Sequence, residues 1–360
     1  MQKRWLNCLR RFSPFARRYK VIFKQSLRWL VTMAICSYAA VMLGWFVAYL
    51  LVGDGFWLLA MVNAFAIYLF VPLLLLLPML FLSALIRRSE TWIAILIVIL
   101  IGFGAFGGDL MPPVTVANAD VDAPALTVMT YNVLYTNTDA TPIAASVLQA
   151  DPDLVAFQEL TPLLARQLER EIGERYPHRT PVNAARCAAE VAVWSRYPLQ
   201  VEDVDPDFLC RVCSILLDFD GRAVRVVSVH GWPFTGLDRE SIERSFKWRQ
   251  KQIELIIDMV DDQPEPLILL GDLNATPSHE VYHTLSVRLT DAFREAGWGL
   301  GHTWPTTGGK FKGIPYPSRL VRIDHIFHSA HWWSEIAWVG EWDGYSDHYP
   351  VVARLRLRDS

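Results

Sequence analysis

Three long stretches without a charged residue constrain this chain of 360 residues more than any other feature. Trp29–Val52 runs for 24 residues without charge, Phe56–Ile86 for 31 and Thr91–Gly108 for 18. A helix needs roughly 20 apolar residues to cross a hydrocarbon layer of about 30 Å. We therefore predict three transmembrane helices within residues 29–110. A buried core helix is the weaker alternative, because no amphipathic segments surround these runs.

The distribution of positive charge predicts the topology. Residues 1–28 hold nine Lys and Arg and no acid, and Arg87 and Arg88 lie between the second and third stretches. Only Asp54 lies between the first two. Since Lys and Arg resist translocation, we expect a basic cytoplasmic segment 1–28 and an extracytoplasmic remainder after three crossings. The prediction is a multi-pass protein of an inner or plasma membrane, with the lipid bilayer as its partner.

Two alternatives for the N-terminal region fit less well. The first apolar stretch is too long for a signal peptide, and the second follows after three residues, so we reject cleavage. The basic segment adjoins a membrane span and is interleaved with aromatic residues, which favours an interfacial segment over a nucleic-acid site.

The rest of the chain is acidic. Eleven of the 34 Lys and Arg, but only two of the 37 Asp and Glu, lie before Thr91, so the remainder carries a net charge near −12. Nonspecific binding of a long nucleic acid depends on cations that replace counterions. This charge balance disfavours such binding, although a local site lined by cations remains compatible with it.

The cysteines say little about function. Cys187, Cys210 and Cys213 would lie in a compartment that permits disulfides. We expect one disulfide among these three, and the sequence does not decide the pairing. Structural zinc is disfavoured, because no second CxxC pair accompanies Cys210 and Cys213.

Short β-rich runs and a few helical stretches follow a linker at 111–124, which is rich in proline and small residues. Strands are predicted at Leu126–Val133, Leu154–Gln158, Val191–Ser195, Ser214–Phe219, Val224–His230, Leu267–Gly271, Ile323–His328 and Val351–Leu357. Helices are predicted at Thr141–Leu148, Pro162–Ile172 and Leu237–Val260. Interleaved strands and helices over residues 125–358 indicate one α/β domain with a large sheet.

Polar side chains recur where the apolar strands end. Asn132, Gln158-Glu159, His230 and Asp272-Leu273-Asn274 each follow such a run, Asp324 lies inside one, and Asp347-His348 precedes another. Taken singly, each has a structural explanation as a cap, a turn residue or a hydrogen-bonded core side chain. Buried polar groups are costly unless paired, so strand ends that converge would gather these groups into one cleft.

This ordered series resembles the endonuclease/exonuclease/phosphatase superfamily. The motifs are Asn132, Gln158-Glu159, Ser195-Arg196-Tyr197-Pro198, His230, Gly271-Asp272-Leu273-Asn274, Arg322-Ile323-Asp324-His325 and Ser346-Asp347-His348. The resemblance covers roughly residues 125–358. It implies a four-layer α/β sandwich, in which two mixed β-sheets pack face to face between helices, preceded here by three transmembrane helices.

The resemblance also implies residue roles. Glu159 should ligate Mg²⁺, with Mn²⁺ as the alternative ion, and Asn132 and Asp347 should support the same ion directly or through water. Asp272 should orient or deprotonate the attacking water, and Asn274 should hold a phosphate oxygen. His230 and His348 should donate to the phosphoryl oxygens, with Asp324 orienting His348. Mg²⁺ prefers carboxylate and water oxygens, and phosphoryl transfer needs mainly charge neutralisation and positioning, so these roles suit these residue types.

We therefore expect a membrane-anchored, Mg²⁺-dependent phosphoesterase that hydrolyses a phosphate ester on the extracytoplasmic side, with a lipid phosphodiester as the leading substrate. An extracytoplasmic nuclease and a hydrolase of small phosphate esters are the other substrate classes. A catalytically inert interaction module tethered to the membrane is the non-enzyme alternative. The sequence identifies no protein partner.

Overall fold

The computed structural model describes residues 2–82, 89–111, 122–181, 191–204 and 211–358, apart from 235, 237, 262, 263 and 312. The chain divides into two compact units. One consists of Met1–Val52 and Ala66–Gly107, and the other of Gly53–Phe65 and Gly108–Ser360. The second unit is therefore discontinuous in sequence. Most of the predicted linker 111–124 lies outside the described residues.

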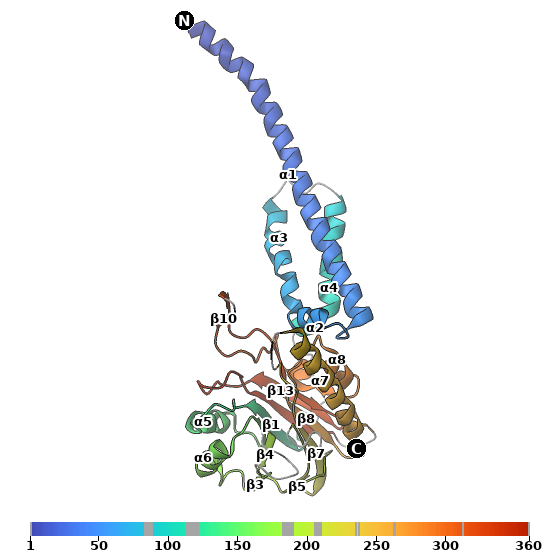
Figure 1. Ribbon diagram of the computed structural model, residues 1–360, viewed down its shortest axis with the longest axis vertical. Helices are drawn as coiled ribbons and strands as arrows, with labels where there is room; N and C mark the ends of the chain where they lie inside the picture. Colours follow the sequence, from blue (N-terminus) through green and yellow to red (C-terminus); the bar gives the residue numbers. More distant parts are fainter. Residues whose placement is uncertain are drawn as a thin grey trace. The chain divides into compact units, whose positions relative to one another are not determined.

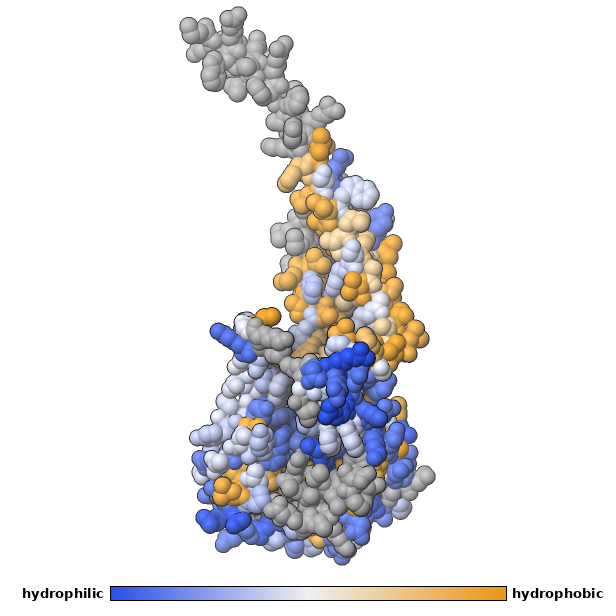
Figure 2. All heavy atoms as spheres, viewed as in Figure 1, coloured by the Kyte–Doolittle hydropathy of each residue, from blue (hydrophilic) through white to orange (hydrophobic). Residues whose placement is uncertain are grey.

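The first unit is helical and contains α1 (Gln2–Val52), the 3-10 helix η1 (Ala66–Phe70), α3 (Val71–Leu82) and most of α4 (Ser89–Leu110). Two of its helices are long and apolar enough to cross a membrane, over Val21–Val52 and Ser89–Gly108. Their exposed side chains are largely apolar, as the orange surface of these helices in Figure 2 shows. These two helices match the first and third predicted spans.

The second predicted span, Phe56–Ile86, is not one helix. Its residues form α2 (Trp57–Ala64), η1 and α3, and the chain bends by 73° between Trp57–Ala64 and Ala66–Leu76. The prediction of three transmembrane helices is therefore corrected to two among the described residues, or three if the bent pair makes one span. The helix breaks at Phe65, where φ is −115° and ψ is 21°, and α2 belongs to the other unit. Hydropathy did not detect this break, because both sides of it are apolar.

The second unit contains two six-stranded sheets. The first has the strand order β13-β14-β1-β2-β4-β3, and the second β5-β6-β7-β8-β12-β9. Each sheet is mixed, since β1 and β2 run parallel, as do β7 and β8, while the other paired strands are antiparallel. The strands of the first sheet are β1 (Ala125–Asn132), β2 (Leu154–Gln158), β3 (His178–Arg179), β4 (Val191–Ser195), β13 (Trp332–Val339) and β14 (Val351–Leu357). Those of the second are β5 (Leu199–Val201), β6 (Val212–Phe219), β7 (Arg222–His230), β8 (Leu267–Asp272), β9 (Thr290–Asp291) and β12 (Asp324–His328).

Helices cover the outer faces of the sheets (Figure 1). Apolar residues of α5 (Thr141–Ala150) and α6 (Pro162–Ile172) form a buried cluster with β1, β2 and β4. Those of α7 (Arg239–Val260) and α8 (Glu280–Ser286) form another with β7, β8 and β12. A short helix, α9 (Ala292–Ala296), and a hairpin of β10 (Gly309–Phe311) and β11 (Ile314–Tyr316) complete the unit. Two mixed sheets with flanking helices are the predicted α/β sandwich.

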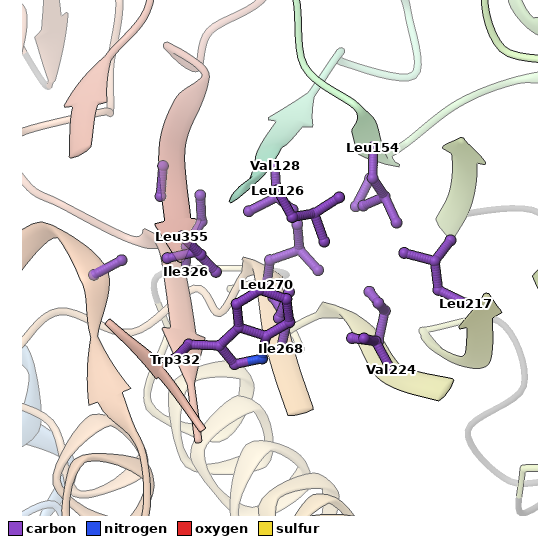
Figure 3. Close-up of a cluster of buried hydrophobic side chains, with 14 of the residues drawn as sticks. Leu126, Val128, Leu154, Leu217, Val224, Ile268, Leu270, Ile326, Trp332 and Leu355 are labelled. Atoms are coloured by element: carbon purple, nitrogen blue, oxygen red, sulfur yellow. The ribbon is translucent and has the colours of Figure 1, made fainter. Parts of the chain in front are cut away.

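The central core lies between the two sheets. Figure 3 shows Leu126, Val128 and Leu154 of the first sheet facing Leu217, Ile268 and Leu270 of the second. All these side chains are fully buried. Such burial contributes about 1.5–3 kcal/mol per large aliphatic side chain, so this layer holds the two sheets in a fixed relation. The strand ends of the two sheets are thereby positioned against each other.

One cysteine expectation can be followed in the structure. Cys213 lies in β6 and is disulfide-bonded, as the prediction of a disulfide among Cys187, Cys210 and Cys213 required. Cys187 and Cys210 lie outside the described residues. The partner of Cys213, which the sequence did not decide, therefore stays open.

Candidate active site

Strand register brings three of the predicted residues into line. In the second sheet, Asp272 of β8 pairs with His230 of β7 on one side and with Asp324 of β12 on the other. In the first sheet, Asn132 pairs with Gln158, so Glu159 follows at the end of β2. Because the two sheets pack face to face, these strand ends meet, and residues separated by up to about 200 positions share one cluster.

Gly271 allows β7 and β8 to pair closely beside Asp272. Its φ is +153°, and a Cβ atom built there would lie only 1.8 Å from the carbonyl oxygen of Val229. No larger residue fits this backbone approach without moving a strand. The glycine before Asp272 is therefore explained by the packing of the strand that carries the carboxylate.

Asn132 connects carboxylates from both sheets. Its Nδ2 donates to Glu159 Oε1 and to Asp272 Oδ2, each at 3.1 Å, while its Oδ1 accepts from the backbone N–H of Leu134 at 3.0 Å. Glu159 Oε2 accepts from the backbone N–H of Tyr135 at 2.9 Å. Glu159 has a left-handed backbone, with φ of +59°. A carboxylate residue in this uncommon conformation is typical of a functional position.

His348 is held as a cation. Its Nδ1 donates to Asp324 Oδ2 at 2.9 Å, and its Nε2 lies 3.8 Å from Asp272 Oδ2. Burial alone would lower the pKa of His348, but the negative charges of Asp324 and Asp272 outweigh it and raise this pKa to about 10. The imidazole is therefore protonated at neutral pH, and its Nε2 has no hydrogen bond to Asp272 at this distance.

Asp272 is fully buried at the centre of the cluster. Burial raises the pKa of its carboxyl group; the positive charge of His348 opposes this shift, and the negative charge of Asp324 adds to it. Asn274 stays close, since its backbone N–H donates to Asp272 Oδ1 at 2.8 Å and its Nδ2 lies 3.2 Å from Asp272 Oδ2. Asn274 also has a left-handed backbone, with φ of +49°.

His230 lies on the opposite side of Asp272 from Asp324. Its Nε2 is 3.7 Å from Glu159 Oε1 and 3.9 Å from Asp272 Oδ2. Its Nδ1 lies 3.4 Å from Nη1 of Arg211, a residue that the sequence analysis did not single out. Arg211 lies just before β6 and opposite His230 in the antiparallel register of β6 and β7, where the His230 N–H donates to the Arg211 carbonyl oxygen at 2.7 Å, so extending the register of these two strands would have found it.

Asp347 lies at the rim of the cluster. Its Oδ1 is 3.9 Å from His348 Nε2, and its Oδ2 accepts from the indole N–H of Trp304 at 3.1 Å. Its side chain is 44% exposed, unlike the buried carboxylates of Asp272 and Asp324. The structure thus brings all eight predicted residues into one connected cluster: Asn132, Glu159, His230, Asp272, Asn274, Asp324, Asp347 and His348.

The donor set fits a hard divalent cation. Four carboxylates surround two imidazoles, so the cluster carries excess negative charge that a cation would neutralise. Oδ1 of Asp324 is buried and has no hydrogen-bond partner within the described part of the chain. Ligand atoms of Asp272, Asp324 and His348 lie within 4.8 Å of one another. Asp324 is fully buried and its Oδ2 accepts from His348, whereas the side chain of Glu159 is 19% exposed, which leaves the Glu159 side better suited to an ion that keeps bound water.

Comparison with known families agrees with this geometry. The profile described as "Endonuclease/Exonuclease/phosphatase family" matches residues 129–348, which is more than half of the chain. The members of this family are metal-dependent hydrolases of phosphate esters. Among curated proteins, no relative matches the sequence.

Several solved structures resemble the chain at low sequence identity. An endonuclease/exonuclease/phosphatase from Beutenbergia cavernae is 21% identical, covers 65% of this chain and 72% of its own, and has a TM-score of 0.47. Sphingomyelinase C from Streptomyces griseocarneus is 20% identical, with coverages of 64% and 99% and a TM-score of 0.46. The 3′ phosphatase NExo from Neisseria, bound to a product DNA hairpin, is 21% identical, with coverages of 63% and 98% and a TM-score of 0.49.

Proposed function

Since the chain belongs to the endonuclease/exonuclease/phosphatase family, we propose that it is a membrane-anchored, divalent-metal-dependent hydrolase of phosphate esters. The observation that carries this proposal is the convergence of Glu159, Asp272 and His348 with their partners on adjoining strand ends. An inert interaction module would not need a fully buried carboxylate flanked by two histidines, because such an arrangement costs folding free energy.

We assign the metal to the Glu159 side of the cluster, with Glu159 and Asp347 as ligands and Asn132 as their support. Mg²⁺, or Mn²⁺ in its place, would supply positive charge to the phosphoryl oxygens when bound. Asn132 donates its amide hydrogens to Glu159 and Asp272, so in this conformation it fixes the two carboxylates relative to each other.

The remaining residues position water and phosphate. Asp272 is anchored by the Asn274 backbone and would orient the attacking water and accept its proton. His348 carries a positive charge and would donate from Nε2 to a phosphoryl oxygen, while Asp324 fixes its ring. His230 and the amide of Asn274 would donate to the other oxygens of the transferred group.

Charge and unit composition support an extracytoplasmic site. Segment 1–28 carries nine cations and no acid, which favours a cytoplasmic N-terminus. Segment 53–65 follows α1 and belongs to the same unit as 108–360, so both lie on the side opposite the N-terminus if α1 crosses the membrane. If α4 also crosses, the chain must recross between residues 66 and 88. This makes three crossings and keeps Arg87 and Arg88 in the cytoplasm.

A lipid phosphodiester is the substrate class we favour. The anchor holds the site at a bilayer, and the part of the chain from Thr91 onward carries a charge near −12, which disfavours binding of a long polyanion. A nuclease would need a cationic groove along its substrate. A lipid requires only that one headgroup reach the cluster.

The full-length chain in detergent micelles tests these statements together. We expect hydrolysis of bis(4-nitrophenyl) phosphate with Mg²⁺ and none with EDTA, and hydrolysis of phospholipid or sphingomyelin vesicles but not of plasmid DNA. Cleavage of plasmid without cleavage of vesicles would replace the lipid assignment with a nuclease. Inertness toward every substrate, with either Mg²⁺ or Mn²⁺, would refute the enzyme itself.

A further inference from the structure

Segment 53–65, which joins α1 to η1, belongs to the unit that carries the active site. Asp54 Oδ2 accepts from the backbone N–H of Glu280 at 2.8 Å, and the carbonyl oxygen of Ala60 lies 3.2 Å from His279 Nε2. Both contacts fall at the start of α8. The chain between Asp272 and α8 is the loop that carries Asn274, so segment 53–65 contacts the far end of a catalytic loop.

His279 connects this loop to segment 53–65 through both ring nitrogens. The backbone N–H of Thr276 donates to Nδ1 at 2.8 Å, so Nδ1 is unprotonated and the proton resides on Nε2. Nε2–H then donates to the carbonyl of Ala60. Burial, together with the charge of Arg249, lowers the pKa of His279 to about 3, which keeps the ring neutral and in one tautomer.

Arg249 of α7 contacts the same loop from inside the protein. Its Nη1 donates to the carbonyl oxygen of Asn274, and its guanidinium lies 4.5 Å and 4.4 Å from the ring centroids of Phe234 and Phe246. The side chain is only 2% exposed, and Nη2 has no hydrogen-bond partner among the residues that the structure describes.

The negative charge of Asp54, in segment 53–65, partly offsets the positive charge of Arg249. Burial lowers the pKa of Arg249 to about 10; the negative charge of Asp54 opposes this shift first, and that of Asp272 second. Loss of either negative charge would leave the buried guanidinium less well compensated, and Asp54 also contacts the end of the loop directly through its hydrogen bond from the Glu280 N–H at 2.8 Å. Arg249 in turn holds the carbonyl of Asn274.

Asn274 needs such support. Its left-handed backbone, at φ of +49°, is uncommon for a residue other than glycine, so the contacts around it help to hold it. Its side chain lies within 3.2 Å of Asp272 Oδ2 and donates to the carbonyl of Gly231 at 3.0 Å. A small shift of this backbone would move the amide away from the phosphate position.

We propose that the membrane-proximal segment 53–65 positions the catalytic loop 273–280, with Asp54, Arg249 and His279 as positioning residues that act through Asn274. This inference rests on the proposed function for the role of Asn274. The contacts of Asp54, Arg249 and His279 described above, which we call the brace, do not depend on that function. The segment between two membrane helices is then a working part of the hydrolase.

Hydrogen exchange of the full-length chain in detergent tests the brace without any assay of activity. Asp54→Asn removes the charge while an amide oxygen can still accept from Glu280. We expect amide exchange at 273–280 to rise about tenfold, with exchange in α5 and α6 unchanged. Asp258→Asn is the matched control, because Asp258 is exposed on α7, and it should change neither region.

Kinetics test whether the brace acts through Asn274. We expect Asp54→Asn to lower kcat about tenfold, since a small misplacement of a catalytic group has effects of this size or larger. In an Asn274→Ala background the same substitution should change kcat by less than about twofold, because residues that act through one group are not additive. A merely structural contribution would lower kcat equally in both backgrounds.

The outcomes separate the two proposals. Unchanged exchange at 273–280, or a rise spread over the whole unit, would overturn the positioning role, as would additive losses of kcat. If the unsubstituted chain has no hydrolase activity with Mg²⁺ or Mn²⁺, the proposed function fails. The exchange result then decides alone whether segment 53–65 positions the loop.

Discussion

At the scale of single residues, the two histidines of the site have different partners. His348 donates to Asp324 and is held as a cation, whereas His230 lies between Arg211 on its Nδ1 side and Glu159 on its Nε2 side. Both face Asp272, which is buried and accepts from Asn132 and Asn274. The chemistry of the site therefore depends on the protonation states of Asp272 and His348, whose charges affect each other.

Removal of either group should abolish most of the activity. We expect Asp272→Asn and His348→Gln each to lower kcat at least about 100-fold, because these groups act mainly in the transition state. Turnover of bis(4-nitrophenyl) phosphate by the full-length variants measures this, with thermal unfolding as the check on folding. Rates near that of the unsubstituted chain in either variant would mean that the site lies elsewhere.

Asp324 should set the alkaline limit of activity. His348 must be protonated to donate, so activity should fall as pH rises through its pKa, which the carboxylates raise to about 10. Asp324→Asn removes one of these charges, so the pKa should fall toward 6.5 and the alkaline limb of kcat/KM should move to lower pH by more than one unit. If the alkaline limb does not move, the ionisation of a group other than His348 determines it.

The same shift links pH to stability in the metal-free protein. The folded-state pKa of His348 lies above its unfolded value of about 6.5, so its contribution is complete below pH 6.5. That contribution is lost as pH rises toward about 10. Denaturant titrations across this window should show a smaller loss of unfolding free energy for Asp324→Asn than for the unsubstituted chain.

At the scale of elements, a buried ion pair joins β9 to the residues just before β12. Arg322 Nη1 donates to Asp291 Oδ2 at 2.7 Å, and both side chains are at most 2% exposed. Tyr282 of α8 donates to the same carboxylate oxygen at 2.7 Å, and Asp291 Oδ1 caps α9 by accepting from Phe293 N–H. This pair therefore fixes β12, and with it Asp324, against two helices.

Loss of one charge of this pair should destabilise the fold strongly. Asp291→Asn keeps the size of the side chain and an oxygen for the cap but removes the negative charge that the buried guanidinium of Arg322 contacts. We expect a loss of about 3 kcal/mol in unfolding free energy, and partial recovery when Arg322→Met is added. Chemical denaturation measures both variants, and a cost below about 1 kcal/mol for the single substitution would contradict this account.

The elements with regular patterns were predictable. Strands such as Leu154–Gln158 and Val351–Leu357 agree with the sequence prediction because their apolar runs are continuous and bounded by turns. β13 was missed, since a register shift between Ser334 and Ile336 interrupts its alternation. The short α8 and α9 carry too few turns for periodicity to be seen.

Site residues at strand ends were predictable for the same reason, since register alone aligns His230, Asp272 and Asp324. Trp304 as the donor to Asp347 was not, because Trp304 lies outside the long strands. Arg211 lies opposite His230 in the register of β6 and β7, and it was missed because the strand was predicted to begin at Ser214. Segment 53–65 was assigned to membrane spans and their connecting turn, because hydropathy cannot distinguish lipid from a protein surface as the neighbour of α2.

At the scale of the whole molecule, the sequence holds two compact units whose segments alternate along the chain. Among the residues that the structure describes, α1 and α4 contain the two helices that pass as candidate membrane spans by length and composition, and the helix pair between them bends by 73°. The orientation of the chain in a membrane is therefore predicted from its charges, since helix length alone does not distinguish the two sides of the bilayer.

Reporter fusions test the orientation. We expect a reporter that is active only outside the cytoplasm to function when fused after Ser360, and a cytoplasm-dependent reporter to function when fused after Arg88. Lys and Arg at 1–28 and at 87–88 are the physical reason for this expectation. Activity of the cytoplasm-dependent reporter after Ser360 would reverse the assignment.

If the chain is anchored as we propose, the alternation of the two units along the sequence affects what a protease could release from the membrane. A protease that cut between α4 and β1 would release a fragment without segment 53–65. This fragment would lack Asp54 and the Ala60 carbonyl that His279 contacts. Such a shed fragment would diffuse in three dimensions with a loosened catalytic loop. If the chain is anchored and its loop positioned as we propose, full turnover would be confined to molecules that keep their membrane helices, and hydrolysis to the surface of that membrane.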